Sequence, residues 1–148
     1  MKHSDFVTYG IKYFTADEIV ETGASLKDVS ASLISNLNEY RRLMQQPIFL
    51  LKNGLTTGKH KSKEHPAGLA VDIYFQNDKK LNSVAFMVFN AVKAGFNGVG
   101  VYHNGNAYSM HLDIGRNIRQ WVAIKPHTKK GWQYFSMIND PKTIQGKG

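Results

Sequence analysis

Two histidine–aspartate pairs constrain the fold of this chain more than any other feature of its sequence. The first pair is His65 and Asp72, seven residues apart in the segment His-Pro-Ala-Gly-Leu-Ala-Val-Asp, and the second is His111 and Asp113. An imidazole nitrogen and a carboxylate oxygen at the first spacing can bind one metal ion, and the second pair can complete its coordination sphere. A fold that uses both pairs must bring them to one place.

The residue types of this potential site are typical of a catalytic metal. Two histidines and one aspartate with an open fourth position are the ligand set of a catalytic zinc ion, whereas a structural zinc ion usually takes four protein ligands, mostly cysteines. The chain contains no cysteine. A structural zinc site and a disulfide-bonded scaffold are therefore both unsupported.

The length and the composition predict a single domain over residues 1–148. The chain has 148 residues, of which 42% are hydrophobic, and this is enough to bury a core. No apolar run of 18 residues could span a bilayer, and residues 1–6 lack the apolar stretch of a signal peptide. We therefore expect synthesis in the cytoplasm without a signal peptide, and no insertion into a membrane.

The net charge suggests an anionic partner. Nineteen Lys and Arg residues against eleven Asp and Glu residues give a charge of +8. Nucleic acid, a membrane surface and an anionic cell-wall polymer would each fit this charge, and a basic surface that only aids solubility fits it equally well. The basic residues are scattered, and no nucleic-acid-binding motif occurs. We expect no nucleic-acid partner.

The pattern of apolar residues predicts an α+β domain in which an antiparallel sheet packs against helices. Thr15 and Glu18 have the form of a capping box at the start of a short helix. Apolar residues recur at helical spacing from Leu26 to the Gln46-Pro47 boundary, with Ser25 as the expected N-cap. The other expected elements are strands at 48–51 and 69–75, a helix at 81–94, a hairpin of strands 98–102 and 107–114, an edge strand at 121–124, and a basic aromatic tail at 125–148.

This layout predicts where the histidines and aspartates lie. Asp72 falls within the 69–75 strand, and His65 lies on the loop before it, where Gly68 allows a sharp turn. His111 and Asp113 are two residues apart on one strand, so their side chains project from the same face. If these strands are neighbours in one sheet, both pairs converge on one face.

In these motifs the chain resembles the M15 zinc peptidases, which belong to the Hedgehog/DD-peptidase fold group. The resemblance rests on His-x-x-Gly-x-Ala-x-Asp at 65–72, Gly-Val-Gly-Val-Tyr at 98–102 and His-Leu-Asp-Ile-Gly at 111–115, followed by Arg116, Arg119 and Trp121. It covers residues 14–124 and is closest to the small branch with a His-x-Asp ending, which is found in bacteria and bacteriophages. Such enzymes cleave peptide bonds in the stem or cross-bridge of peptidoglycan, so the resemblance implies a peptidase that acts at the bacterial cell wall.

The resemblance also implies the metal ligands, and the positions of the other residues suggest their roles. His65, Asp72 and His111 would bind Zn²⁺, which lowers the pKa of a bound water to ~7. Asp113 is the expected general base, with two alternatives: it orients a ligand histidine, or it is itself a ligand. Glu64 is the reserve base. Tyr102 or His103 would stabilise the oxyanion, although a tyrosine in a strand more often serves packing.

Two departures from the family pattern favour a second hypothesis. Lys63 stands where the family usually has a serine two residues before the first ligand histidine, and no arginine falls between Arg42 and Arg116 to hold a substrate carboxylate. Lys63 or a neighbouring lysine would have to supply that charge, as a point charge and not as a bidentate fork. The alternative is a non-catalytic structural or wall-binding module that retains the fold. Trp121, Trp132 and Phe135 are expected to serve packing and not sugar stacking.

Overall fold

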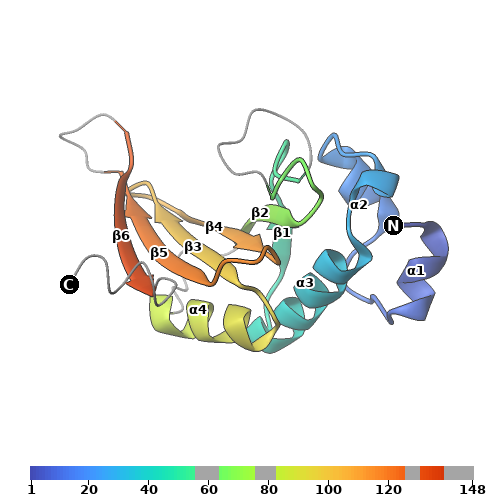
Figure 1. Cartoon of the computed structure of the whole chain (residues 1–148), viewed down its shortest axis with the longest axis horizontal. Coiled ribbons are helices and arrows are strands. Elements are labelled where there is room, and N and C mark those ends of the chain that lie inside the picture. The colour runs from blue at the N-terminus through green and yellow to red at the C-terminus, as the bar shows by residue number, and fades with distance from the viewer. Residues whose placement is uncertain (56–63, 76–82, 126–130, 139–148) are drawn as a thin grey trace.

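A mixed β-sheet lies at the centre of the computed structural model, which describes residues 1–55, 64–75, 83–125 and 131–138 (Figure 1). Within these residues, six strands form one sheet in the order β1-β2-β4-β3-β5-β6. The strands are β1 (Ile48–Leu50), β2 (Ala70–Phe75), β3 (Gly98–His103), β4 (Tyr108–Asp113), β5 (Arg119–Ile124) and β6 (Gln133–Ile138). The two strands that carry the histidine–aspartate motifs, β2 and β4, are direct neighbours.

The sheet is not wholly antiparallel, so this part of the sequence prediction was wrong. β5 pairs with β3 in parallel, whereas the other neighbouring strands are antiparallel. After the β3–β4 hairpin, residues 114–118 carry the chain back past the start of β3, so β5 runs beside β3 in the same direction. Asn97 fixes this crossing, because its carbonyl accepts a hydrogen bond from Arg119 N at 2.9 Å and its side chain donates to Gly115 O at 2.7 Å.

Two helices, α3 (Ala31–Met44) and α4 (Val84–Lys93), cover one face of the sheet (Figure 1). Alternate residues of the strands point toward these helices and form one core with them. Tyr40 of α3 is fully buried there, and its hydroxyl donates to Met87 O of α4 at 3.0 Å. The core side chains of the central strands are Val71, Ile73, Val99, Val101, Met110 and Leu112. The other face of the sheet carries the polar motifs.

The predicted long helix is interrupted near its start. A 3₁₀ turn, η1 (Leu26–Asp28), comes first, and α3 begins only after Ser30, which is its N-cap in place of the expected Ser25. Val29 between them has extended backbone angles, φ −102° and ψ 133°. The amide of Ser30 donates to the carbonyl of Gly68 at 3.0 Å, so the interruption is where the loop before β2 docks.

The other predicted elements are mostly confirmed. The capping box of Thr15 and Glu18 starts α2 (Ala16–Glu21), and the two motif strands and the hairpin lie within a residue or two of their expected bounds. The predicted helix at 81–94 is confirmed as α4, with its first two positions outside the described residues. Two elements were not predicted: α1 (His3–Thr8), and β6, which turns part of the tail into an edge strand. The strand expected at the edge, 121–124, is β5, and it is not an edge strand because it lies between β3 and β6. Together these elements form a single α+β domain.

Candidate metal centre

The strand register aligns three rows of side chains on the face of the sheet away from α3 and α4. The first row runs from Asp72 through His111 and Gly100 to Trp121, which are direct partners across β2, β4, β3 and β5. The rows on either side of it are Ala70, Asp113, Gly98 and Arg119, and then Tyr74, Ser109, Tyr102, Ala123 and Tyr134. The predicted convergence of the two motifs on one face is therefore confirmed.

A tight turn at residues 64–68 brings His65 over the first row. Gly68 N donates to His65 O at 3.0 Å, and Leu69 N donates to Glu64 O at 2.9 Å. Gly68 has φ +73°, and a Cβ atom there would overlap the carbonyl oxygen of Asp28. Only glycine fits this position, as the sequence indicated.

Three potential ligand atoms form a nearly equilateral triangle. His65 Nε2 lies 3.1 Å from His111 Nδ1, and Asp72 Oδ1 lies 3.3 Å from each of these nitrogens. Ligand atoms at ~2.0–2.1 Å from a tetrahedral zinc ion are ~3.3–3.4 Å apart, so the observed spacing fits such an ion without rearrangement. His65, Asp72 and His111 can therefore hold a metal ion together.

The hydrogen bonds behind the two histidines leave the correct nitrogens available. His65 Nδ1 contacts the carbonyl oxygen of Leu55 at 2.7 Å, and His111 Nε2 contacts Asp113 Oδ2 at 2.7 Å. A carbonyl and a carboxylate can only accept, so these two nitrogens carry the protons. In the neutral imidazoles the lone pairs of His65 Nε2 and His111 Nδ1 then face Asp72, as metal binding requires.

The ionisation of the cluster also suits a cation site. Burial lowers the pKa of His111, but its hydrogen bonds to Asp113 and Asp72 outweigh burial and raise that pKa to about 9. Burial raises the pKa of Asp72, but its hydrogen bonds to His111 and His65 outweigh burial and bring that pKa to about 2. Without a metal, a proton on His111 therefore occupies the space between the imidazoles and the Asp72 carboxylate at neutral pH.

Asp113 lies behind His111 and not among the three ligand atoms. Its side chain is 1% exposed, and it accepts hydrogen bonds from His111 Nε2 at 2.7 Å, Gly115 N at 3.0 Å and Arg119 Nη2 at 3.3 Å. Burial raises the pKa of Asp113, but the contact with His111 and these further partners outweigh burial and hold the pKa below its usual range. Of the three roles left open by the sequence, this geometry favours the one in which Asp113 orients a ligand histidine.

A second set of side chains supports His111 from the β5 side. The indole of Trp121 lies 5.4 Å from the His111 ring, centre to centre, and occupies the space that a Cβ atom at Gly100 would fill. Trp121 Nε1 donates to the hydroxyl of Tyr102 at 3.0 Å. Burial raises the pKa of Tyr102 to about 12 although the Trp121 hydrogen bond lowers it, so the phenol keeps its proton at neutral pH.

Two described residues that were proposed from the sequence, His103 and Glu64, are not among the residues that form the triangle. His103 follows Tyr102 on β3 and so points to the opposite face, where its ring lies 4.4 Å from that of Tyr108. Glu64 is buried beside Gly115, on the same side as Asp113. Lys63 lies outside the described residues, as do His60 and His127, whereas His3 is exposed as expected.

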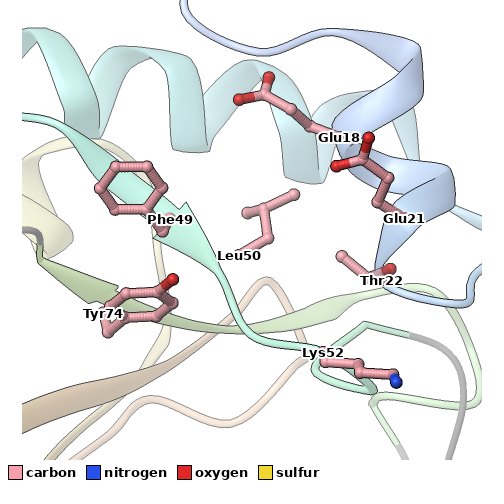
Figure 2. A pocket seen from close by; sticks show the side chains of 7 residues that line it. All are labelled: Glu18, Glu21, Thr22, Phe49, Leu50, Lys52 and Tyr74. Atoms are coloured by element: carbon pink, nitrogen blue, oxygen red, sulfur yellow. The ribbon is translucent and has the colours of Figure 1, made fainter.

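Two cavities that share lining residues, together called the groove below, lie near this centre, and none of the three ligand residues lines either cavity. A cavity of about 600 Å³ is lined by Leu51, Lys52, Tyr74, Asn104, Ser109 and Trp132. It shares Leu50, Lys52 and Tyr74 with a second cavity of about 360 Å³, in which Phe49 and Tyr74 of β1 and β2 stack at 5.4 Å opposite Glu18 and Glu21 of α2 (Figure 2). Tyr74 and Ser109 occupy the row next to Asp72 and His111, so the groove begins one residue pair from the potential metal site.

The contact that sequence reasoning missed at this centre is made by the main chain. The acceptor for His65 is the Leu55 carbonyl, and no residue type signals a backbone acceptor.

Comparisons of the chain with protein-family models, with curated proteins and with solved structures give no match. Within the described residues, no helix has the length and apolar character needed to cross a membrane.

Proposed function

We propose that this protein is a zinc-dependent hydrolase of peptide bonds in peptidoglycan, with the Hedgehog/DD-peptidase fold and M15 family membership that its motifs suggest. One observation carries the proposal: His65 Nε2, His111 Nδ1 and Asp72 Oδ1 lie 3.1–3.3 Å from one another. A site with three protein ligands leaves a position for water, whereas a structural site would be closed by a fourth ligand. Bound zinc would supply a water of lowered pKa and would polarise the scissile carbonyl.

The chain's own residues hold and surround this site. Asp113 keeps the proton of His111 on Nε2, and Leu55 O keeps that of His65 on Nδ1. Tyr102 is the hydrogen-bond donor that we assign to a developing oxyanion. Its oxygen accepts from Trp121, its pKa of about 12 keeps it protonated, and it lies one row from His111. The groove along Tyr74 and Ser109 would hold the substrate.

The peptidoglycan substrate rests on the resemblance of the two motifs to the M15 peptidases. The charge of +8 supports it, since bacterial walls carry anionic polymers. By this proposal the protein acts at the bacterial cell wall on stem peptides, either as a bacterial enzyme or in the lysis or virion of a bacteriophage.

A second function is favoured by one observation. The carboxylate of Asp113, the expected general base, is already engaged by His111, Gly115 and Arg119. A module that binds metal and cell wall without hydrolysis would need no base. The alternative is therefore a wall-binding or structural relative that retains the site.

One experiment separates the two functions. The protein is purified, its zinc content is measured without chelators at neutral pH, and it is incubated with purified sacculi, followed by mass spectrometry of released muropeptides. We expect about one zinc per chain and new peptide ends that also identify the bond cleaved. The His111→Ala variant should lose both. Stoichiometric zinc without released muropeptides would support the non-catalytic module, and absence of zinc binding would refute both functions.

A further inference from the structure

We propose that Arg119 is a positioning residue, which acts through Asp113 to hold His111 in its metal-binding orientation. The inference rests on the proposed metal site and assigns a role to a residue outside the ligand set. Arg119 Nη2 lies 3.3 Å from Asp113 Oδ2, the oxygen that also receives the Nε2 proton of His111 at 2.7 Å. Arg119 is therefore connected to a potential ligand through one intervening residue, Asp113, and two hydrogen bonds.

Asp113 needs a partner of this kind. Its carboxylate is 1% exposed, and a buried carboxylate is stable only when hydrogen bonds and an opposite charge compensate the loss of water. Gly115 N binds Oδ1 at 3.0 Å, but an amide carries no net charge. A protonated His111 also compensates Asp113 in the metal-free protein, but a His111 that binds metal is neutral, and Arg119 stays charged in both states.

Arg119 is itself fixed by the aromatic side of the centre. Its guanidinium lies 5.3 Å from the centre of the Trp121 ring, and the Trp121 ring in turn packs against His111. Arg119 therefore contacts both supports of the same histidine: the carboxylate behind Nε2 and the indole beside the ring.

Two glycines of β3 leave the space for this arrangement. A Cβ atom at Gly98 would overlap the carboxylate of Asp113, and one at Gly100 would overlap the indole of Trp121. Gly98 pairs with both Asp113 and Arg119 in the register, so the side chains of β4 and β5 meet across it. The Gly-Val-Gly segment thus allows contacts that any larger residue would block.

The contacts of Arg119 suit a role in orienting its neighbours more than a role in stability. Its Nε is buried without a hydrogen-bond partner among the described residues, and an unpaired buried N–H costs stability. A planar guanidinium can stack on an indole and donate sideways to a carboxylate at once, which an ammonium cannot.

The test measures metal binding, by competition with a chromogenic chelator, and the visible spectrum of the Co²⁺-substituted protein, which reports ligand geometry. We expect Arg119→Ala to weaken zinc binding roughly 10–100-fold, the usual effect of losing a residue behind a ligand, and to alter the Co²⁺ bands. Arg41→Ala is the matched control, because Arg41 also packs on an aromatic ring, that of Tyr13, with 4.6 Å between the guanidinium and the ring centre. This control should bind zinc like the wild type.

Arg119→Lys keeps the positive charge and is the second test variant, to be used if Arg119→Ala does not fold. Because a lysine cannot stack and donate in the same way, it should still bind zinc several-fold more weakly and show altered Co²⁺ bands. A folded variant at position 119 with zinc affinity within twofold of the wild type and an unchanged Co²⁺ spectrum would overturn the inference. A wild-type protein that binds no zinc would instead refute the proposed function, so the two failures are distinguishable.

Discussion

Metal binding should displace a proton from His111, and this exchange predicts a steep pH dependence. In the metal-free protein the pKa of His111 is about 9, so at pH 7 the ring is almost fully protonated, and Nδ1 cannot bind a metal until that proton leaves. The two units between pH 7 and that pKa correspond to about 2.7 kcal/mol, or a roughly 100-fold lower apparent affinity at pH 7 than above pH 9. Asp72, with a pKa of about 2, is ionised throughout and adds nothing to the slope.

Isothermal titration calorimetry checks this prediction. Zinc is titrated into chelator-treated protein between pH 7 and 8.5, in buffers with different enthalpies of ionisation. The affinity should rise about tenfold per pH unit, with about one proton released per metal ion bound. His103→Gln is the control, since this ring lies on the opposite face and should leave the slope unchanged. An affinity that stays constant over this range, or binding without proton release, would refute the assignment of His111 as a ligand through Nδ1.

Four further predictions follow from the same geometry. Asp113→Asn should lower zinc affinity roughly tenfold or more in the chelator assay, because the carboxylate orients His111. If the variant instead keeps full zinc occupancy and loses turnover, Asp113 is the general base. Gly100→Ala should destabilise the fold by about 1–3 kcal/mol in urea denaturation, because its methyl group displaces Trp121, and an unchanged midpoint would contradict the packing described. Trp132→Ala should raise KM on peptidoglycan with little change in kcat, whereas unchanged kinetics would remove the groove from substrate binding. In the metal-free protein the stability contributed by His111, up to about 3 kcal/mol, should be fully present at pH 6.5 and be lost as the pH rises through 9, because the raised pKa of His111 stabilises only the protonated state. A flat profile over this range would contradict that pKa.

Local patterns in the sequence predicted the elements but not their order in the sheet. The alternation of apolar residues identified the strands at 69–75 and 107–114, and Asn-Gly identified the hairpin between β3 and β4. Whether β5 adds beside β4 or beside β3 depends on the path of residues 114–118, which no periodicity encodes. The expected antiparallel sheet was wrong for this reason.

The candidate metal centre was predictable to the extent that it depends on residue spacing. The strand pattern placed Asp72 and His111 on neighbouring strands, and the choice of these two with His65 as the ligands followed from the resemblance of the motifs. The role of Asp113 depends on which nitrogen of His111 it contacts, and both nitrogens are compatible with the same spacing. The break between Leu26 and Ser30 could not be predicted, because a helical pattern continues through it. The Ser30 amide at this break donates a hydrogen bond to Gly68, which is distant in sequence.

The contact between the α3 start and the His65 turn has a consequence for how this sequence can vary. Gly68 has no room for a side chain beside the Asp28 carbonyl, and its own carbonyl binds the Ser30 amide. Substitutions at 28–30 that alter the backbone path would therefore shift His65, although they lie more than thirty residues from it in the chain. Among natural variants we expect substitutions at positions 28–30 to be accompanied by substitutions in the 64–68 turn, so that the two segments covary.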